Sequence, residues 1–306
     1  MRLFIKTPRP DENKYIPHLL EHCVLQANNV KDFIGIQIPI YASTATWYTE
    51  FEFEKTKLKA LLEKLDTQIT QDTFNLQQKI IQKELKWSSF WQKAYIDSLR
   101  KISWNRKLNS NSVAKWINFK DIVNYQKNYY THNNMILVNE QDEIAKFWWI
   151  ENSIKFDPEI KLESEIKYKQ TKFQWEIFDN IYTKYKTPYD IIILDFFYNL
   201  INDYTYYLDT KKWKYRYDYS DISITDNFMI INFEKWYLPK NISKEFFEYY
   251  KKAYIKNINK WENRNYIPII ALFTWYYISK KQHAKFIENI DIKTIKNILK
   301  TWIINF

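Results

Sequence analysis

The chain has 306 residues and a formal net charge of +10, since 46 Lys and Arg stand against 36 Asp and Glu. Its hydrophobic fraction of 46% and charged fraction of 27% are typical of a globular protein with a sizeable core, and its length favours two domains. A single cysteine, Cys23, excludes an internal disulfide and fits a reducing, cytoplasmic compartment. No apolar run of roughly 18 residues occurs, which argues against a membrane span.

The first half of the chain shows the hydrophobic periodicities of both strands and helices. Leu58, Leu61 and Leu65, for example, recur at helical spacing. In chain order, the predicted elements are strand Arg2–Lys6, helix Pro17–Gln26, strands Phe33–Tyr41 and Trp47–Glu54, helix Thr56–Ile69, a long helix Phe74–Leu99, helix Phe119–Tyr130 and strand Met135–Val138.

The second half repeats this order after a charged stretch, Pro158–Lys172, that is typical of a linker. Its predicted elements are a strand near Phe173–Phe178, helix Pro188–Leu200, a hairpin that pairs Tyr215–Thr225 with Asn227–Phe233, and helices Ser243–Trp261, Tyr266–Lys281 and Ile292–Ile304. We therefore expect an α+β fold of two similar domains, each a mainly antiparallel sheet with packed helices. The expected limits are 1–155 for the first domain, 156–172 for the linker and 173–306 for the second domain.

The most informative motif is His18-Leu19-Leu20-Glu21-His22, on the predicted helix Pro17–Gln26. Residues four apart lie on one face of an α-helix, so both imidazoles can bind one metal ion. Glu21 flanks that face, where its carboxylate can take a proton from a water molecule without being a ligand. The H-x-x-E-H pattern is the inverted zincin motif, in which two histidines bind zinc and the glutamate acts on protons. The competing interpretation is a surface helix that carries two of the chain's 4 histidines by chance.

A catalytic zinc ion needs a third protein ligand and one open position for water. His132 lies in a polar turn and His283 on a Lys-rich helix, so we expect both at the solvated surface. Glu84 is a better candidate, on a predicted helix whose Ile81 and Leu85 would face the core. A glutamate on a helix is nevertheless usually a solvated charge.

A resemblance to a known family begins at the zinc motif. Residues 16–25, IPHLLEHCVL, resemble the zinc-binding segment of the pitrilysin/insulinase/processing-peptidase superfamily, especially its presequence-protease branch. Glu84 and the two residues after it resemble the end of the helix that carries this family's third zinc ligand. The resemblance therefore implies Zn²⁺ bound by His18, His22 and Glu84, with Glu21 as the catalytic base. The family often has a supporting glutamate seven residues before the third ligand. Here that residue is Gln77, which can form a hydrogen bond but adds no charge, so we expect weaker metal binding or a slower reaction.

Two further segments resemble parts of the family that bind substrate. Ala42, Ser43 and Thr44 resemble the edge strand to which a peptide adds as an extra strand, with Tyr41 in place of the usual Asn. Arg216 and Tyr217 lie in a segment that resembles the family's R-x-x-G-x-x-Y element in the second domain. The resemblance also implies short or unfolded peptides as substrates, and a homodimer or a paired homologous subunit that encloses them.

The chain contains one Gly and 13 Trp, whereas Gly makes up about 7% of residues in average proteins. Turns with positive φ and helix C-caps normally need Gly. Trp87, Trp104 and Trp213 are among the tryptophans that stand where a Gly is expected. One hypothesis is that the organism reads UGA as Gly where the written sequence has Trp. The other is a truly Trp-rich protein that uses Asn and Asp in its turns.

Zinc-dependent hydrolysis of peptide bonds is therefore the expected activity. The first alternative is an inactive scaffold or partner subunit of the same family, which Gln77 favours. The second is a basic nucleic-acid-binding protein, suggested by net charge and aromatic content. The lysines are dispersed along the chain rather than clustered, which argues against nucleic acid as a partner.

Overall fold

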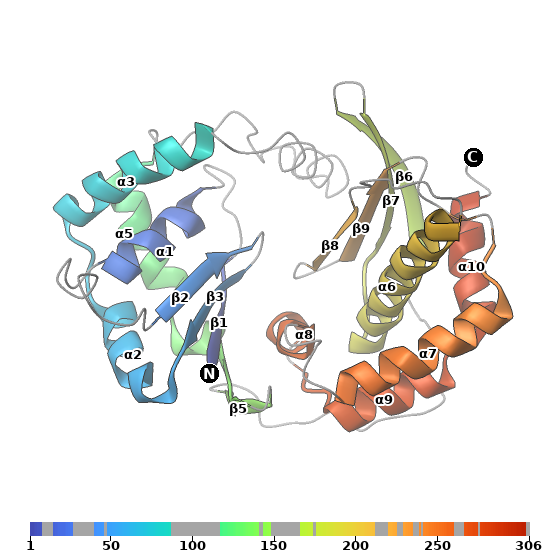
Figure 1. Cartoon of the computed structure of the whole chain (residues 1–306). Coiled ribbons are helices and arrows are strands. Elements are labelled where there is room, and N and C mark those ends of the chain that lie inside the picture. The colour runs from blue at the N-terminus through green and yellow to red at the C-terminus, as the bar shows by residue number, and fades with distance from the viewer. Residues whose placement is uncertain are drawn as a thin grey trace. The chain divides into compact units, whose positions relative to one another are not determined.

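The computed structural model describes residues 1–7, 15–26, 40–45, 48–86, 117–140, 143–147, 166–173, 176–211, 220–224, 229–234, 239, 241–259, 266–274 and 276–303. The chain divides into two compact units (Figure 1). Unit 1 comprises Met1–Lys93 and Asn105–Glu151, and unit 2 comprises Ala94–Trp104 and Asn152–Phe306.

The described part of unit 1 contains a five-stranded antiparallel sheet with the strand order β2-β3-β1-β4-β5. Its strands are β1 (Arg2–Lys6), β2 (Ile40–Thr44), β3 (Tyr48–Phe53), β4 (Met135–Val138) and β5 (Ile144–Phe147). Its helices are α1 (Ile16–Gln26), α2 (Leu58–Asp66), α3 (Gln71–Lys86) and α5 (Phe119–Tyr129). Because β1 pairs with both β3 and β4, the N-terminal strand lies in the middle of the sheet.

Helix α1 lies against the sheet and contacts α3 and α5 as well as β2 (Figure 1). Leu19 and Val24 of α1 are fully buried in an apolar cluster that also includes Leu3 and Ile5 of β1. These alternating residues of β1 share one face of the strand, so the same face of the sheet meets the helix. Packing on this cluster fixes which side of α1 remains partly exposed.

Unit 2 also combines an antiparallel sheet with helices. Its described strands form an antiparallel sheet with the order β6-β7-β9-β8. They are β6 (Ile166–Phe173), β7 (Glu176–Thr183), β8 (Ser220–Ile224) and β9 (Met229–Glu234). The helices are α6 (Pro188–Lys211), α7 (Lys244–Asn259), α8 (Tyr266–Thr274), α9 (Lys280–Asn289) and α10 (Ile292–Ile303). Helix α6 contacts β8 and β9 as well as α7, α8 and α9, and therefore forms the centre of this unit.

Asp195 and His283 are among the titratable groups that are buried in the helices of unit 2. Asp195 on α6 accepts a hydrogen bond of 2.6 Å from the Tyr254 hydroxyl, and burial raises the pKa of its carboxyl to about 7. His283 on α9 is only 2% exposed, and burial lowers its pKa to about 3. The expectation that His283 is a solvated surface residue is therefore wrong. The lysines of α9 occupy its exposed side, while His283 belongs to its buried side together with Phe286 and Ile287.

The predicted α+β class is confirmed, since both units combine an antiparallel sheet with packed helices. Several local predictions differ from the structure; the helix predicted to end at Leu200, for example, extends to Lys211. The charged stretch predicted as a linker contains β6 from Ile166 onward. The single helix predicted over Tyr266–Lys281 is two helices, because Ser279 and Gln282 form a capping box that starts α9 afresh. The domain limits 1–155, 156–172 and 173–306 stay a prediction.

Several expectations concern residues outside the described ranges. They include the end of the predicted helix Phe74–Leu99 beyond residue 86 and the tryptophans of the recoding hypothesis, of which only Trp302 falls within a described helix. Among the residues described, we find no helix with the length and apolar character that a membrane crossing requires.

Candidate metal centre

Two imidazoles project from the partly exposed side of α1. The ring centroids of His18 and His22 are 4.8 Å apart, and their planes are nearly perpendicular at 82°. Their side chains are 33% and 20% exposed, whereas Leu19 and Cys23 of the same helix are fully buried. The periodicity of the helix thus separates a core side from a side on which both imidazoles are accessible.

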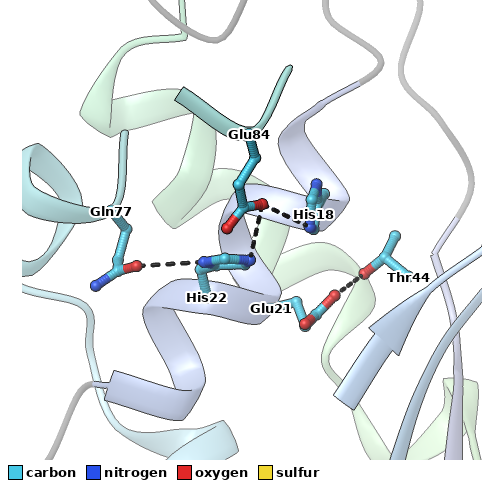
Figure 2. A network of polar contacts seen from close by, with 6 residues as sticks. All are labelled: His18, Glu21, His22, Thr44, Gln77 and Glu84. Atoms are coloured by element: carbon cyan, nitrogen blue, oxygen red, sulfur yellow. Dashed lines mark hydrogen bonds and ion pairs between the residues drawn. The ribbon is translucent and has the colours of Figure 1, made fainter. Parts of the chain in front are cut away.

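Glu84 on α3 approaches both histidines (Figure 2). Its Oε2 atom lies 3.8 Å from His18 Nε2 and 3.7 Å from His22 Nε2. One ligand atom from each of the three residues lies within 4.8 Å of the other two. The contact between α1 and α3 therefore brings together residues that are far apart in the sequence.

This set of atoms fits a zinc ion. Two imidazole nitrogens and one carboxylate oxygen form a usual ligand set for catalytic zinc. Tetrahedral ligands at the usual distances from zinc lie about 3.4 Å from one another. The separations of 3.7 and 3.8 Å would need to close only slightly, and the third separation, between the two imidazole ligand atoms, is at most 4.8 Å. Three protein ligands would leave one coordination position for water or substrate.

Glu21 belongs to a different contact. Its carboxylate Oε2 accepts a hydrogen bond of 2.6 Å from the Thr44 hydroxyl on β2 (Figure 2). Burial raises the pKa of the Glu21 carboxyl above its ordinary value; the bond from Thr44 and the nearby His22 oppose this shift, while Glu84 adds to it. Glu21 is thus a buried carboxylate beside the ligand set, with a proton affinity higher than that of a solvated glutamate.

Gln77 supports the ligand set from within α3. Its side chain is fully buried, and its Oε1 atom lies 3.3 Å from His22 Nδ1. The other end of the amide, Nε2, donates to Oε1 of Gln26 at the end of α1. Two turns of α3 separate Gln77 from Glu84, which places both on the side of the helix that faces α1.

Cys23 takes no part in this arrangement. Its thiol is fully buried in the apolar cluster of unit 1, and burial raises its pKa to about 12. It lies on the core side of α1, whereas both imidazoles lie on the accessible side, so Cys23 is not part of the candidate ligand set.

The predicted substrate strand lies next to these residues. Ala42, Ser43 and Thr44 belong to β2, which pairs with β3 and ends the strand order of the described sheet. Their side chains alternate, so that Ser43 is exposed while Ala42 and Thr44 are half-buried. Thr44 connects this edge to Glu21 through its hydroxyl. Arg216 and Tyr217 lie outside the described residues.

This network extends to Thr7 and Gln26, which the sequence did not single out, and to Thr49, which follows the segment that resembles the family's edge strand. Thr49 Oγ1 lies 3.2 Å from Thr44 Oγ1 and 3.0 Å from Thr7 Oγ1, so a row of hydroxyls crosses the sheet behind Glu21. Gln26 follows His22 by four residues on the same helix, and this helical spacing was the signal that could have identified it. The contacts among the threonines depend on the register of β2 with β3, in which Thr44 pairs with Thr49. The sequence does not show this register.

No family model and no curated protein matches the sequence. The fold, however, matches solved structures. One is the first half of the periplasmic protease PqqL from Escherichia coli, with a TM-score of 0.56 and 11% sequence identity over 99% of this chain and 84% of that one. Full-length PqqL gives a TM-score of 0.57 at 12% identity, over 98% of this chain and 43% of that one.

A third structure is a variant of the ferredoxin protease FusC in complex with Arabidopsis ferredoxin, with a TM-score of 0.52 and 10% identity. It is matched over 98% of this chain and 43% of its own length. The chain thus spans less than half of full-length PqqL and FusC. At these identities the likeness establishes a shared fold with proteases, while the chemistry has to be argued from the residues of this chain.

Proposed function

We propose that this chain is a zinc-dependent metallopeptidase that hydrolyses short or unfolded peptides. The observation that carries the proposal is the convergence of His18, His22 and Glu84, whose ligand atoms lie within 4.8 Å of one another, beside a buried Glu21. The fold shared with proteases supports it. So does the resemblance of residues 16–25 to the pitrilysin/insulinase zinc motif.

The residues have separate chemical roles in this proposal. Zinc held by His18, His22 and Glu84 would supply a Lewis acid that lowers the pKa of water toward about 7 and polarises a carbonyl. Glu21 accepts the proton of the attacking water and passes it to the leaving amine. Thr44 holds the carboxylate by its Oε2 atom.

The same proposal assigns the substrate to β2. A peptide that adds as an extra strand along Ala42, Ser43 and Thr44 would use main-chain hydrogen bonds, which suit an unfolded substrate of varied sequence. The division into a zinc-bearing domain and a second homologous domain is part of the proposal. The proposal also includes a homodimer or a paired homologous subunit, and a cytoplasmic location. PqqL is periplasmic, so location needs its own measurement.

The alternative within the same fold is an inactive scaffold. It is favoured by Gln77, which stands where the resembling family often has a glutamate and which offers His22 a neutral acceptor instead of a carboxylate. Weak metal binding by the native protein would support this alternative.

The test measures bound zinc and the cleavage of an unstructured fluorogenic peptide on the same samples. The native protein should bind one zinc ion per chain and cleave the peptide. Glu21→Gln should keep the zinc and lose activity by about 10²–10⁴-fold, because it removes only the proton acceptor. His22→Ala should lose zinc and activity together.

Glu63→Gln is the matched control, since Glu63 lies on α2 with its side chain 67% exposed. It should leave both readouts unchanged. Full activity in Glu21→Gln would exclude the proposed mechanism. A native protein with neither zinc nor activity would favour the scaffold.

A further inference from the structure

The amide of Gln77 lies in the interior between α1 and α3, and both of its ends are used. Its oxygen lies 3.3 Å from His22 Nδ1, and its nitrogen donates to the side-chain oxygen of Gln26. Gln77 is fully buried, so leaving either end of its amide without a hydrogen-bond partner would destabilise the protein. Because both hydrogen bonds use one rigid amide group, the direction of one bond fixes the direction of the other.

The direction of these bonds decides where His22 carries its proton. A carbonyl oxygen only accepts, so the contact with Gln77 Oε1 requires a proton on Nδ1 of the neutral imidazole. Nε2 then has a free lone pair, and it is the atom that lies 3.7 Å from Glu84 Oε2. This is the tautomer that can bind a metal ion through Nε2.

A glutamine can also bind in the reverse sense. If the amides of Gln77 and Gln26 both turned over, the same two contacts would remain, but Gln77 would donate to Nδ1 and the proton of His22 would move to Nε2. A carboxylate at position 77 could not donate to Nδ1, because an ionised carboxylate only accepts hydrogen bonds. The use of glutamine at this position thus makes the tautomer of His22 depend on a second residue.

We propose that Gln26 is a positioning residue that sets the tautomer of His22 through Gln77. Its side-chain oxygen accepts from Gln77 Nε2, which turns the Gln77 oxygen toward Nδ1 and leaves Nε2 free for a divalent metal ion. Gln26 lies four residues after His22 on α1, so the two side chains share one side of the helix. The consequence for metal binding rests on the proposed function, whereas the tautomer is a property of the metal-free protein.

The experiment compares Gln26→Glu, which can only accept, with Gln26→Lys, which can only donate. The first readout is the ¹⁵N spectrum of histidine-labelled, metal-free protein at about pH 8.5, where an ordinary histidine is neutral. The chain has 4 His, and the signal of His22 is identified by its loss in His22→Ala. We expect the Nδ1–H tautomer in the native protein and in Gln26→Glu, and the Nε2–H tautomer in Gln26→Lys.

The second readout is zinc affinity, measured by competition with a chelator. Gln26→Lys should weaken binding by about 10–100-fold, the usual effect of losing a partner that orients a ligand. The same change in a Gln77→Glu background should cost less than about 3-fold, because the carboxylate accepts from both neighbours. An equal loss in both backgrounds would point to charge or structure and overturn the proposal.

A native protein with the Nε2–H tautomer, or one whose tautomer does not respond to either change at position 26, would also overturn it. A native protein that has the expected tautomers but binds no zinc would refute the proposed function and leave this inference standing.

Discussion

The Thr44 hydroxyl donates a hydrogen bond of 2.6 Å to the Glu21 carboxylate and so connects β2, the first strand in the order of the described sheet, to the proposed general base on α1. The bond joins a helix and a strand through residues that are 23 positions apart in the sequence. Thr49 in turn contacts Thr44, so the hydroxyl that holds Glu21 is itself held by the sheet.

Replacing Thr44 should therefore slow the reaction without removing the metal. In Thr44→Val the Glu21 carboxylate loses its partner, and a hydrogen bond to a charged group is worth about 1.5–3 kcal/mol. We expect kcat to fall by about 10–100-fold while KM and bound zinc stay close to native values. Thr44→Ser keeps the hydroxyl and should recover most of kcat. If Ser were as impaired as Val, the strand packing of Thr44 and not its hydroxyl would be the cause.

The assignment of Glu84 is tested by metal affinity alone. Glu84→Gln keeps the size of the side chain but removes the charged ligand, so zinc should bind more than about 100-fold more weakly, beyond the usual effect of losing an outer partner. The measurement is competition with a chelator, with Glu63→Gln as the exposed control. Native affinity in Glu84→Gln would remove Glu84 from the ligand set.

Buried Asp195 should make unit 2 less stable as pH rises. Its pKa is about 7 in the folded protein, whereas the ordinary pKa of an aspartate is 3.8, so between these pH values the folded state holds a proton that the unfolded state has released. Its contribution is greatest below pH 4 and falls by up to about 1.4 kcal/mol per pH unit until pH 7. In Asp195→Asn this slope should vanish. Urea unfolding from pH 4.5 to 8 measures it, and equal slopes in both proteins would contradict the burial effect.

His283 should give the opposite slope. Its pKa is lowered to about 3 from 6.5, so the unfolded state binds the proton first, and stability is lost as pH falls below about 6.5. Between about pH 4 and 6.5 the contributions of Asp195 and His283 oppose each other in the native protein. The variant His283→Phe should therefore become more stable on acidification in this range, and Asp195→Asn less stable. Parallel unfolding curves for the two variants would rule out this compensation.

Local elements could be predicted wherever apolar periodicity is regular. β1 and β4 have the predicted limits, Arg2–Lys6 and Met135–Val138, and α1 starts one residue before the predicted position. The lysines of β6 are typical of a solvated segment, and for this reason the sequence predicts a linker there. Among the described strands β6 lies at the edge of its sheet, where lysines are common at exposed positions. The strand order could not be predicted, since pairing between distant segments leaves no local periodicity.

The candidate site, too, could be predicted only where local spacing reveals it. The pairing of His18 with His22 follows from helical spacing and was visible in the sequence. Glu84 was identified only by family resemblance, because a helical glutamate has no local mark of metal binding. The contacts of Thr44 with Glu21 and of Gln77 with Gln26 join separate elements, and they became visible only when the helices and strands were packed together.

The burial of Cys23 also gives the protein a chemical reporter. It is the single cysteine of the chain, and its pKa of about 12 keeps it a thiol at neutral pH, so alkylating reagents should react with it only when the core of unit 1 opens. The rate of alkylation then measures the opening of unit 1 alone, even while unit 2 is folded or unfolding. Adding zinc should slow that rate in proportion to metal occupancy, because binding to the folded state lowers the open population. One thiol thus lets metal binding be followed without a substrate.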